Sequence, residues 1–163
     1  MVDSDSTADI GVIKEFMDLS PSEPLLVADA LTPVQYRVYP DTPLTEVLDL
    51  IVRRGLEVVP VVGERYEFLG VITEGDSLKH LLARWRETQS EAEAEENNGA
   101  VIARDVMTRS VLCVSEDEEL IDAAIKLVNR DVDQLPVVRA GELVGFLARE
   151  SVLRILFTGE KDS

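Results

Sequence analysis

The sequence has only one cysteine, Cys113, and one histidine, His80, among its 163 residues. A single cysteine excludes a disulfide within the chain, and a single histidine excludes a multi-histidine metal site. No apolar run approaches the ~18 residues of a membrane span, and no signal-peptide pattern opens the chain. Bases are also few, because 16 Lys and Arg stand against 32 Asp and Glu, a net charge of −16. Since nucleic acid and anionic lipid repel such a polyanion, we expect neither nucleic acid nor a membrane as a partner. Taken together, these features predict a soluble cytoplasmic protein.

Much of the acidity lies in two segments. Residues 1–24 carry six acids against one lysine, and residues 87–98 carry five glutamates and no base. Acidic stretches of this kind are usually solvated tails and linkers. We therefore predict an acidic N-terminal extension over 1–24, with a short amphipathic helix, and an acidic flexible linker over 87–99.

The remaining sequence repeats itself at an offset of about 76 residues. Asp29-Ala30-Leu31-Thr32 aligns with Asp105-Val106-Met107-Thr108, and Pro60-Val61-Val62 aligns with Pro136-Val137-Val138. After one deletion in a predicted turn, Gly70 aligns with Gly145. The repeat predicts two copies of one unit, at 25–86 and 100–158, followed by a tail over 159–163. Each copy is near the size limit for independent stability, so we expect the copies to pack together.

Hydrophobic periodicity predicts the elements of each copy. In the first copy, apolar residues at helical spacing run from Leu44 to Val52. Thr42-Pro43 supplies a predicted cap and an early-turn proline, and Gly55 is predicted to end the helix. Two short apolar runs, 58–62 and 68–72, predict a hairpin, and a helix follows from about Asp76. The second copy predicts a helix from Leu120, strands at 135–138 and 143–147, and a last helix. Each copy is also predicted to open with a short extended segment, near 36–39 and 111–114. The predicted order in each copy is therefore strand, helix, strand, strand, helix, which gives an α+β fold.

This doubled unit resembles a tandem CBS-domain pair, also called a Bateman module. The resemblance rests on the opening Asp-x-(Leu/Met)-Thr, on Pro-Val-Val before a hairpin, and on Gly-h-h-Thr-x-x-Asp after it, where h is apolar. It covers roughly residues 25–84 and 100–158. It implies two units packed as a pseudo-two-fold pair, an adenosine-containing ligand in the cleft between them, and a dimer of chains.

The sharpest motif is Gly70-Val71-Ile72-Thr73-Glu74-Gly75-Asp76. A carboxylate has two acceptor oxygens and can take both vicinal hydroxyls of a ribose. The resemblance implies that Thr73 and Asp76 contact that ribose, whereas the spacing alone fits a helix-capping pattern equally well. We expect backbone contacts from the opening segment and the first strand of the hairpin. The predicted ligand-binding residues are Thr73, Asp76, Thr32, Val34, Tyr36, Val59 and Pro60.

The second copy departs from this motif, because Ala148 and Ser151 replace the threonine and the aspartate. Serine can make one hydroxyl bond but cannot hold two hydroxyls. We therefore expect one functional ribose site per chain and a weaker second pocket. The residues predicted for that second pocket are Thr108, Leu135, Pro136 and Ser151.

Two acidic positions bear on the identity of the ligand. The resemblance implies basic, phosphate-facing residues just before the Pro-Val-Val strand, yet this chain has Glu57-Val58 and Asp133-Gln134 there. Carboxylates repel a polyphosphate unless a divalent cation intervenes. The expectation shifts from ATP towards AMP, a nucleoside or S-adenosylmethionine. Nearby bases that could compensate are Arg53, Arg54, Lys79, Arg130 and Arg149.

The sequence thus predicts a non-catalytic regulatory module that senses AMP, ADP, ATP or S-adenosylmethionine and transmits binding to an unknown regulated protein. No catalytic residue is predicted, because no nucleophile–base pair can be assembled from the sequence. No metal ligand and no resident cofactor are predicted either. Apolar residues on the helices after each hairpin predict a homodimer. The alternative function is a dimeric interaction scaffold whose pockets are vestigial.

Overall fold

The computed structural model describes residues 24–88 and 100–160, which form two compact units. We call one the first-repeat unit; it contains residues 34–88, 100–112 and 140–143 of the described chain. The second-repeat unit contains residues 24–33, 113–139 and 144–160. Most of the acidic extension and linker, including the predicted N-terminal helix, lies outside the described residues.

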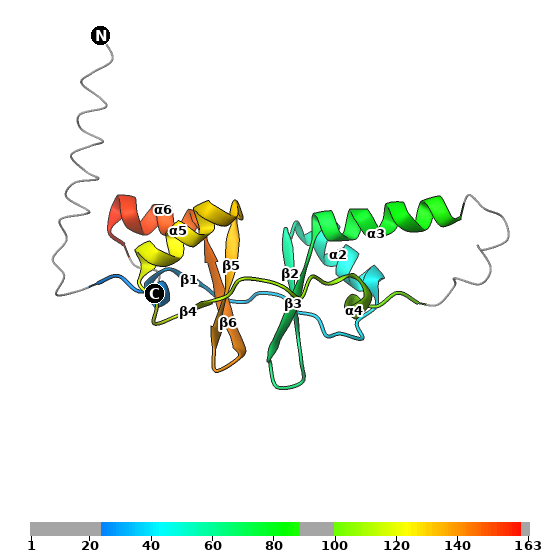
Figure 1. Ribbon diagram of the computed structural model, residues 1–163, viewed down its shortest axis with the longest axis horizontal. Coiled ribbons are helices and arrows are strands. Elements are labelled where there is room, and N and C mark those ends of the chain that lie inside the picture. The colour runs from blue at the N-terminus through cyan, green and yellow to red at the C-terminus, as the bar shows by residue number, and fades with distance from the viewer. Residues whose placement is uncertain (1–23, 89–99, 161–163) are drawn as a thin grey trace, which may run out of the picture. The chain divides into compact units, whose positions relative to one another are not determined.

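The first-repeat unit consists of a hairpin with three helices (Figure 1). Strands β2 (Val58–Val62) and β3 (Phe68–Thr73) are antiparallel, with Val58 opposite Thr73. The helices are α2 (Leu44–Arg54), α3 (Glu74–Glu87) and the short α4 (Ala103–Val106). The predicted hairpin and first helix are therefore confirmed. The opening strand expected near 36–39 is reduced to one parallel bridge, between Val38 and Val61.

The core of the first-repeat unit lies between the hairpin and α2. Successive strand residues point to opposite faces of a strand, and helical residues three to four positions apart share one face of a helix. The apolar residues of the hairpin and of α2 have these spacings, so they face the same interior. Its buried members are Val38, Leu44, Val47, Ile51, Val59, Val61, Ile72 and Ala103. Each has an apolar side chain, so the interior of this unit is held together by hydrophobic burial.

The second-repeat unit repeats the plan and adds a larger sheet. Its hairpin strands are β5 (Gln134–Arg139) and β6 (Glu142–Ala148), although the first two residues of β6 belong to the first-repeat unit. Its long helices are α5 (Leu120–Arg130) and α6 (Arg149–Thr158). Two short strands, β1 (Leu31–Thr32) and β4 (Val114–Ser115), complete the order β1-β6-β5-β4. A 3-10 turn, η1 (Val27–Ala30), precedes β1. The α+β class is thus as predicted.

Each compact unit contains the first residues of the other sequence repeat. We call residues 24–33 and 100–112 the opening segments; the first lies in the second-repeat unit and the second lies in the first-repeat unit. In the first-repeat unit, the amide of Leu44 donates to the carbonyl of Val101, 2.8 Å away. In the second-repeat unit, the amide of Leu120 donates to the carbonyl of Leu25, also at 2.8 Å. The two bonds are equivalent under the 76-residue offset. Each unit is therefore built from the two long helices and the hairpin of one repeat, together with the opening segment of the other repeat, which is residues 100–112 in the first-repeat unit and 24–33 in the second-repeat unit.

Two details of the predicted helix starts are corrected. Pro43 is the N-cap of α2, and the hydroxyl of Thr42 instead accepts a hydrogen bond from the amide of Tyr39 at 2.9 Å. Helix α3 begins at Glu74 rather than near Asp76, because Thr73 is its N-cap. The predicted end of α2 is confirmed: Gly55 has φ of +69°, the left-handed conformation that glycine adopts without steric cost.

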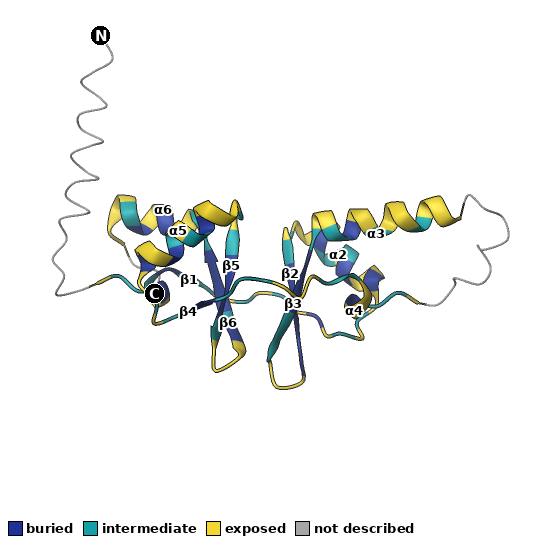
Figure 2. Cartoon of the chain, viewed as in Figure 1, coloured by how far each residue is buried: buried dark blue, intermediate teal, exposed yellow. Residues whose placement is uncertain are grey.

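Much of α3 and α6, the helices after each hairpin, is exposed (Figure 2). The exposed residues include large apolar ones. On α3 these are Leu78, Leu81, Leu82 and Trp85, and on α6 they are Leu153 and Phe157. Inward-facing residues of α6, such as Ile155, are buried. Within the described ranges, no helix is both long and apolar enough to cross a lipid bilayer.

Candidate functional site

Thr73 and Asp76 form a reciprocal capping box at the N-terminus of α3. The amide of Thr73 donates to Oδ2 of Asp76 at 3.0 Å, and the amide of Asp76 donates to Oγ1 of Thr73 at 3.1 Å. Two amides at the helix start are satisfied in this way. The capping interpretation of this motif is therefore correct as far as the fold is concerned. It leaves open what else the carboxylate binds.

A third residue, Thr108, holds the other oxygen of the same carboxylate. Its hydroxyl donates to Oδ1 of Asp76 at 3.1 Å. A carboxylate offers about four lone-pair positions, two on each oxygen. Thr73 and Thr108 use one position on each oxygen, so one further acceptor position remains on each. Asp76 is only partly buried and Thr108 is exposed, so solvent reaches this group. We call Thr73, Asp76 and Thr108 the acidic corner.

The backbone of Thr108 is fixed against β3 in the first-repeat unit. The amide of Thr108 donates to the carbonyl of Val71 at 2.8 Å, and the amide of Val71 donates to the carbonyl of Thr108 at 3.0 Å. This close approach explains the glycine of the motif. A Cβ placed on Gly70 would lie 2.5 Å from the carbonyl oxygen of Thr108, which is closer than Cβ atoms tolerate.

The second-repeat unit contains an equivalent corner without a carboxylate. The hydroxyls of Thr32 and Ser151 lie 3.0 Å apart and form a hydrogen bond. Thr32 lies in β1, which pairs with β6, and it is opposite Phe146. A Cβ placed on Gly145 would lie 2.5 Å from the carbonyl oxygen of Thr32. Ser151 is buried, so its one hydroxyl is engaged inside the protein.

These contacts change the grouping that the sequence predicted. Thr32 was expected beside Asp76 and Thr108 beside Ser151, but the structure joins Thr108 to Asp76 and Thr32 to Ser151. The physical reason is the exchange of opening segments, which brings each opening threonine to the hairpin of the other repeat. From one sequence, the repeat shows that the segments are equivalent, but not which hairpin each one joins.

The other predicted site residues lie in three kinds of environment. Val59, Pro60, Leu135 and Pro136 are buried, so their side chains are committed to the protein interior. Val34 is half-buried. Tyr36 is also half-buried, and its side chain lines a cavity beside α2 instead of the acidic corner. Of the residues predicted for the first pocket, hydrogen bonds join only Thr73 and Asp76 among the described residues.

The charges around the two corners differ. Glu57 precedes Val58, which pairs with Thr73, and Glu74 follows Thr73, so both acids flank the acidic corner along the chain. The equivalent acid of the second repeat, Asp133, has a counter-ion. Arg149, the first residue of α6, lies 3.9 Å from Asp133 and 3.3 Å from Asp131. No ion pair of Glu57 or Glu74 occurs among residues 24–88 and 100–160.

Comparison with known proteins identifies similar sequences. The family model of the CBS domain matches residues 19–83 and 103–158. The chloroplastic CBS domain-containing protein CBSX2 of Arabidopsis thaliana is 29% identical over 147 residues, which cover 78% of this chain and 62% of that protein. An L-aspartate semialdehyde sulfurtransferase of Methanocaldococcus jannaschii is 28% identical, but the match covers only 24% of that enzyme. The chain therefore spans less than two thirds of the length of these relatives.

Solved structures of CBS-domain proteins have a fold similar to that of this chain. CBSX2 in complex with AMP has a TM-score of 0.65 and 34% identity, covering 80% of this chain and 94% of that one. The CBS domain pair of protein MJ0100, in complex with 5'-methylthioadenosine and S-adenosyl-L-methionine, has a TM-score of 0.61 and 25% identity. That match covers 84% of this chain and 98% of the other.

Proposed function

Because the chain belongs to the CBS-domain family, we propose that it is a non-catalytic regulatory module that binds an adenosine-containing ligand. The observation that carries this proposal is the acidic corner. Asp76 is held by Thr73 and Thr108 and keeps one acceptor position on each carboxylate oxygen. Two acceptor positions match the two vicinal hydroxyls of a ribose. The ligand complexes of the similar proteins, with AMP in one case and S-adenosyl-L-methionine in the other, support the same ligand class.

The charge near the corner favours ligands with little negative charge. Glu57 and Glu74 flank Thr73 in sequence and in strand pairing, and both are exposed. Carboxylates repel phosphate groups, and the repulsion grows with each phosphate added. The proposed order of affinity without divalent cations is therefore S-adenosylmethionine and AMP first, then ADP, then ATP. In the second repeat, Asp133 stands at the position equivalent to Glu57, and Arg149 offsets its charge.

Calorimetric titration of the full chain with AMP, ADP, ATP and S-adenosylmethionine tests the proposal. Asp76→Asn keeps an oxygen that can cap α3 but loses the second acceptor oxygen and the charge. A charge-assisted hydrogen bond contributes about 1.5–3 kcal/mol, so binding should weaken roughly tenfold to over a hundredfold. Asp105→Asn is the matched control, because Asp105 caps α4 in the same unit through the amide of Ile102. If no compound of the series binds the unmodified chain at millimolar concentration, the sensor function is wrong.

A second candidate is the interaction scaffold with vestigial pockets. It is favoured by the second corner, where Ser151 is buried and its hydroxyl is spent on Thr32. On this hypothesis the first corner would be structural too, and Asp76→Ala would change stability but no ligand response. Loss of ligand binding by Asp76→Ala, with the fold retained by circular dichroism, supports the sensor instead.

The proposal includes self-association and a regulated partner. Large apolar side chains stay exposed on α3 and on α6, each within its own unit. Exposed apolar patches of this kind usually mark an interface, and closed two-fold pairing is the commonest solution. A homodimer would cover them, and ligand binding could then act on a partner by favouring one arrangement of the dimer.

A further inference from the structure

The first-repeat unit contains a cavity that lies apart from the acidic corner. It is a shallow cavity, widely open to solvent, with a volume of about 520 Å³ between the extended residues 36–39 and one face of α2. This volume falls within the range of small-molecule sites, roughly 300–1,000 Å³. None of the residues that line it belongs to the acidic corner, so a ligand here would leave Asp76 free.

The lining combines aromatic rings with carboxylates. Tyr36 and Tyr39 come from the extended segment, and Glu46 and Asp49 come from α2, with Leu50 beside them. Glu46 and Asp49 are three residues apart on the helix, so they share a face, with Cβ atoms about 5–6 Å apart. Their charge and the negative faces of the tyrosine rings both attract a cation.

The cations near this cavity leave the carboxylates accessible. Arg37 is a lining residue, but its guanidinium lies 4.2 Å from the ring centre of Tyr66, which does not line the cavity. Asp49 pairs with Arg53 at 3.0 Å, but the side chain of Arg53 is 80% exposed. Such solvated pairs contribute little, so a ligand can compete with Arg53. Among the described residues, Glu46 forms no ion pair.

One tyrosine of the lining already faces a cation. The guanidinium of Arg54 lies 5.9 Å from the ring centre of Tyr36. Tyr36 is half-buried, so part of its side chain remains accessible at the lining of the cavity. The hydrogen bond from the amide of Tyr39 to Thr42 fixes the turn at the other end of the lining.

The second repeat lacks this combination of residues. At the 76-residue offset, Leu112 and Ser115 replace the two tyrosines, and Asp122 replaces Glu46. Ile125 replaces Asp49. Both repeats nevertheless form the same helix, since α2 and α5 each have 11 residues. The fold therefore does not require the tyrosines or the paired carboxylates.

We propose that this cavity binds a small aliphatic diamine. Its two ammonium groups would contact Glu46 and Asp49, and its methylene chain would lie on Leu50 and Tyr36. A short diamine spans about the same distance as two carboxylates three residues apart on a helix. The net charge of −16 would raise the local concentration of such a cation. This site is independent of the adenosine site, so either can fail without the other.

Calorimetric titration of the full chain with putrescine tests the proposal, with n-butylamine and sodium chloride at matched ionic strength as references. Saturable binding of one putrescine per chain is expected, several-fold tighter than binding of n-butylamine, because the monoamine reaches only one carboxylate. Glu46→Gln and Asp49→Asn should each weaken putrescine binding about three- to tenfold. Tyr36→Leu should weaken it further by removing the ring.

Two control variants separate the site from general charge effects. Asp122→Asn removes the same charge from the equivalent position of α5, and it should leave putrescine binding unchanged. Asp76→Asn should also leave it unchanged. The proposal is overturned if putrescine shows no saturable binding, if it binds no better than n-butylamine, or if Asp122→Asn weakens binding as much as Glu46→Gln does.

Discussion

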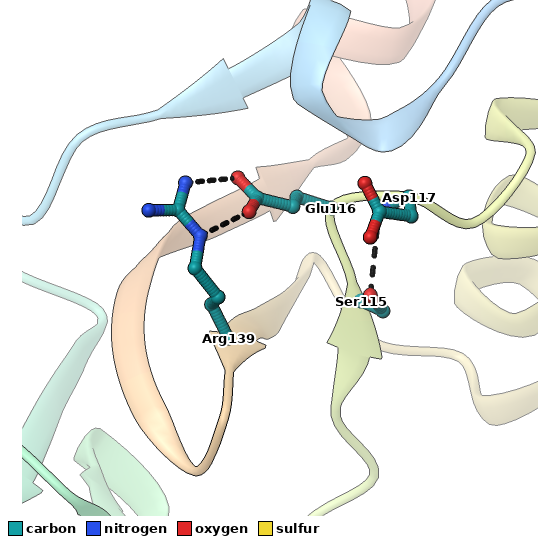
Figure 3. Close-up of polar contacts among 4 residues, drawn as sticks. All are labelled: Ser115, Glu116, Asp117 and Arg139. Carbon is teal, nitrogen blue, oxygen red and sulfur yellow. Dashed lines mark hydrogen bonds and ion pairs between the residues drawn. The ribbon is translucent and has the colours of Figure 1, made fainter.

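Glu116 and Arg139 form a two-point ion pair at the edge of the second-repeat unit (Figure 3). Nη2 of Arg139 lies 2.7 Å from Oε2 of Glu116, and Nε donates to Oε1. The pair ties together the ends of two strands, because β4 and β5 run parallel with Val114 opposite Val137. Hydrogen bonding from Arg139 lowers the pKa of Glu116 below its ordinary value of 4.5, burial opposes this shift, and the charge of Arg139 adds to it.

This pair predicts a pH-dependent contribution to stability. A carboxyl group whose pKa is lowered in the folded protein stabilises the fold fully above its unfolded pKa. The contribution is lost as the pH falls through the lowered, folded pKa. Glu116→Gln should therefore reduce the free energy of unfolding at pH 7, and its difference from the unmodified chain should shrink as the pH falls below 4.5. Urea unfolding measured at a series of pH values checks this.

Glu150→Gln is the control for this experiment. Glu150 pairs with Arg154 at 3.2 Å across one turn of α6, and its side chain is well exposed. Pairs of this type contribute only about 0.3–0.5 kcal/mol. An effect of Glu116→Gln that is no larger than that of Glu150→Gln, or one that grows at acid pH, contradicts the prediction.

Two buried serines should respond oppositely to removal of the hydroxyl. Ser151→Ala leaves the hydroxyl of Thr32 without its partner, so we expect a loss of about 1 kcal/mol in stability. The hydroxyl of Ser77 is also buried but has no hydrogen-bond partner in the described part of the chain. Ser77→Ala should therefore be neutral or stabilising, since alanine is also the better helix former. Thermal unfolding of both variants checks this, and equal losses would contradict it.

The glycines of the repeated motif should not tolerate alanine. In Gly70→Ala and Gly145→Ala the new methyl group would meet a backbone carbonyl at 2.5 Å, and overpacking of this kind costs about 1–3 kcal/mol. Gly75→Ala is the matched control in the first turn of α3. Its nearest atom would be Oγ1 of Thr73 at 3.6 Å, an ordinary contact, so alanine should stabilise the helix by about 1 kcal/mol. Denaturant unfolding distinguishes the three variants, and a Gly70→Ala variant as stable as Gly75→Ala would show that Thr108 does not approach β3.

Local patterns allowed most elements to be predicted from the sequence. The apolar spacing from Leu44 onward and the glycine at position 55 gave α2 its bounds, and the β-branched run gave β2 its bounds. These patterns depend on nearby residues only. The short elements η1 and α4 were not predicted, because four-residue segments carry no periodicity.

The candidate site could be predicted only in part. Thr73 and Asp76 are close in sequence, and their contact follows from helix geometry. The contact between Thr108 and Asp76 joins residues 32 positions apart, and it depends on which hairpin the opening segment joins. Similarly, the spacing of Leu78, Leu81 and Leu82 showed an apolar helix face, but periodicity cannot distinguish a face packed in the core from one left exposed.

Self-association should depend on the exposed apolar residues of α3. Trp85 is 63% exposed, and large aromatic residues often dominate the energy of an interface. We expect light scattering to give about twice the 18.0 kDa chain mass at micromolar concentration. Trp85→Glu should weaken dimerisation at least about tenfold, whereas Arg86→Gln, at the neighbouring exposed position, should change it little. A chain mass near 18.0 kDa at all concentrations, with or without AMP, would contradict the homodimer.

The two corners should differ in occupancy. Asp76 offers a carboxylate with two free acceptor positions, whereas Ser151 offers a hydroxyl already bonded to Thr32. We expect about one adenosine-type ligand per chain. Asp76→Asn should therefore abolish most binding, while Ser151→Ala should leave the affinity and the stoichiometry unchanged. Two equal sites per chain, or a larger loss with Ser151→Ala, would mean that the ligand binds at the other corner.

Converting the second corner into a copy of the first gives the reverse test. In the double variant Ala148→Thr with Ser151→Asp, the new carboxylate could accept from the hydroxyl of Thr32, as Asp76 accepts from Thr108. The new threonine could then cap α6, whose N-cap residue Ala148 makes no side-chain bond at present. The helix N-terminus would also favour the added negative charge. We expect the stoichiometry measured by calorimetry to rise from about one ligand per chain to about two. Ala148→Thr alone is the control, because it restores the cap without the carboxylate. If the folded double variant still binds one ligand, the missing carboxylate is not what separates the two corners.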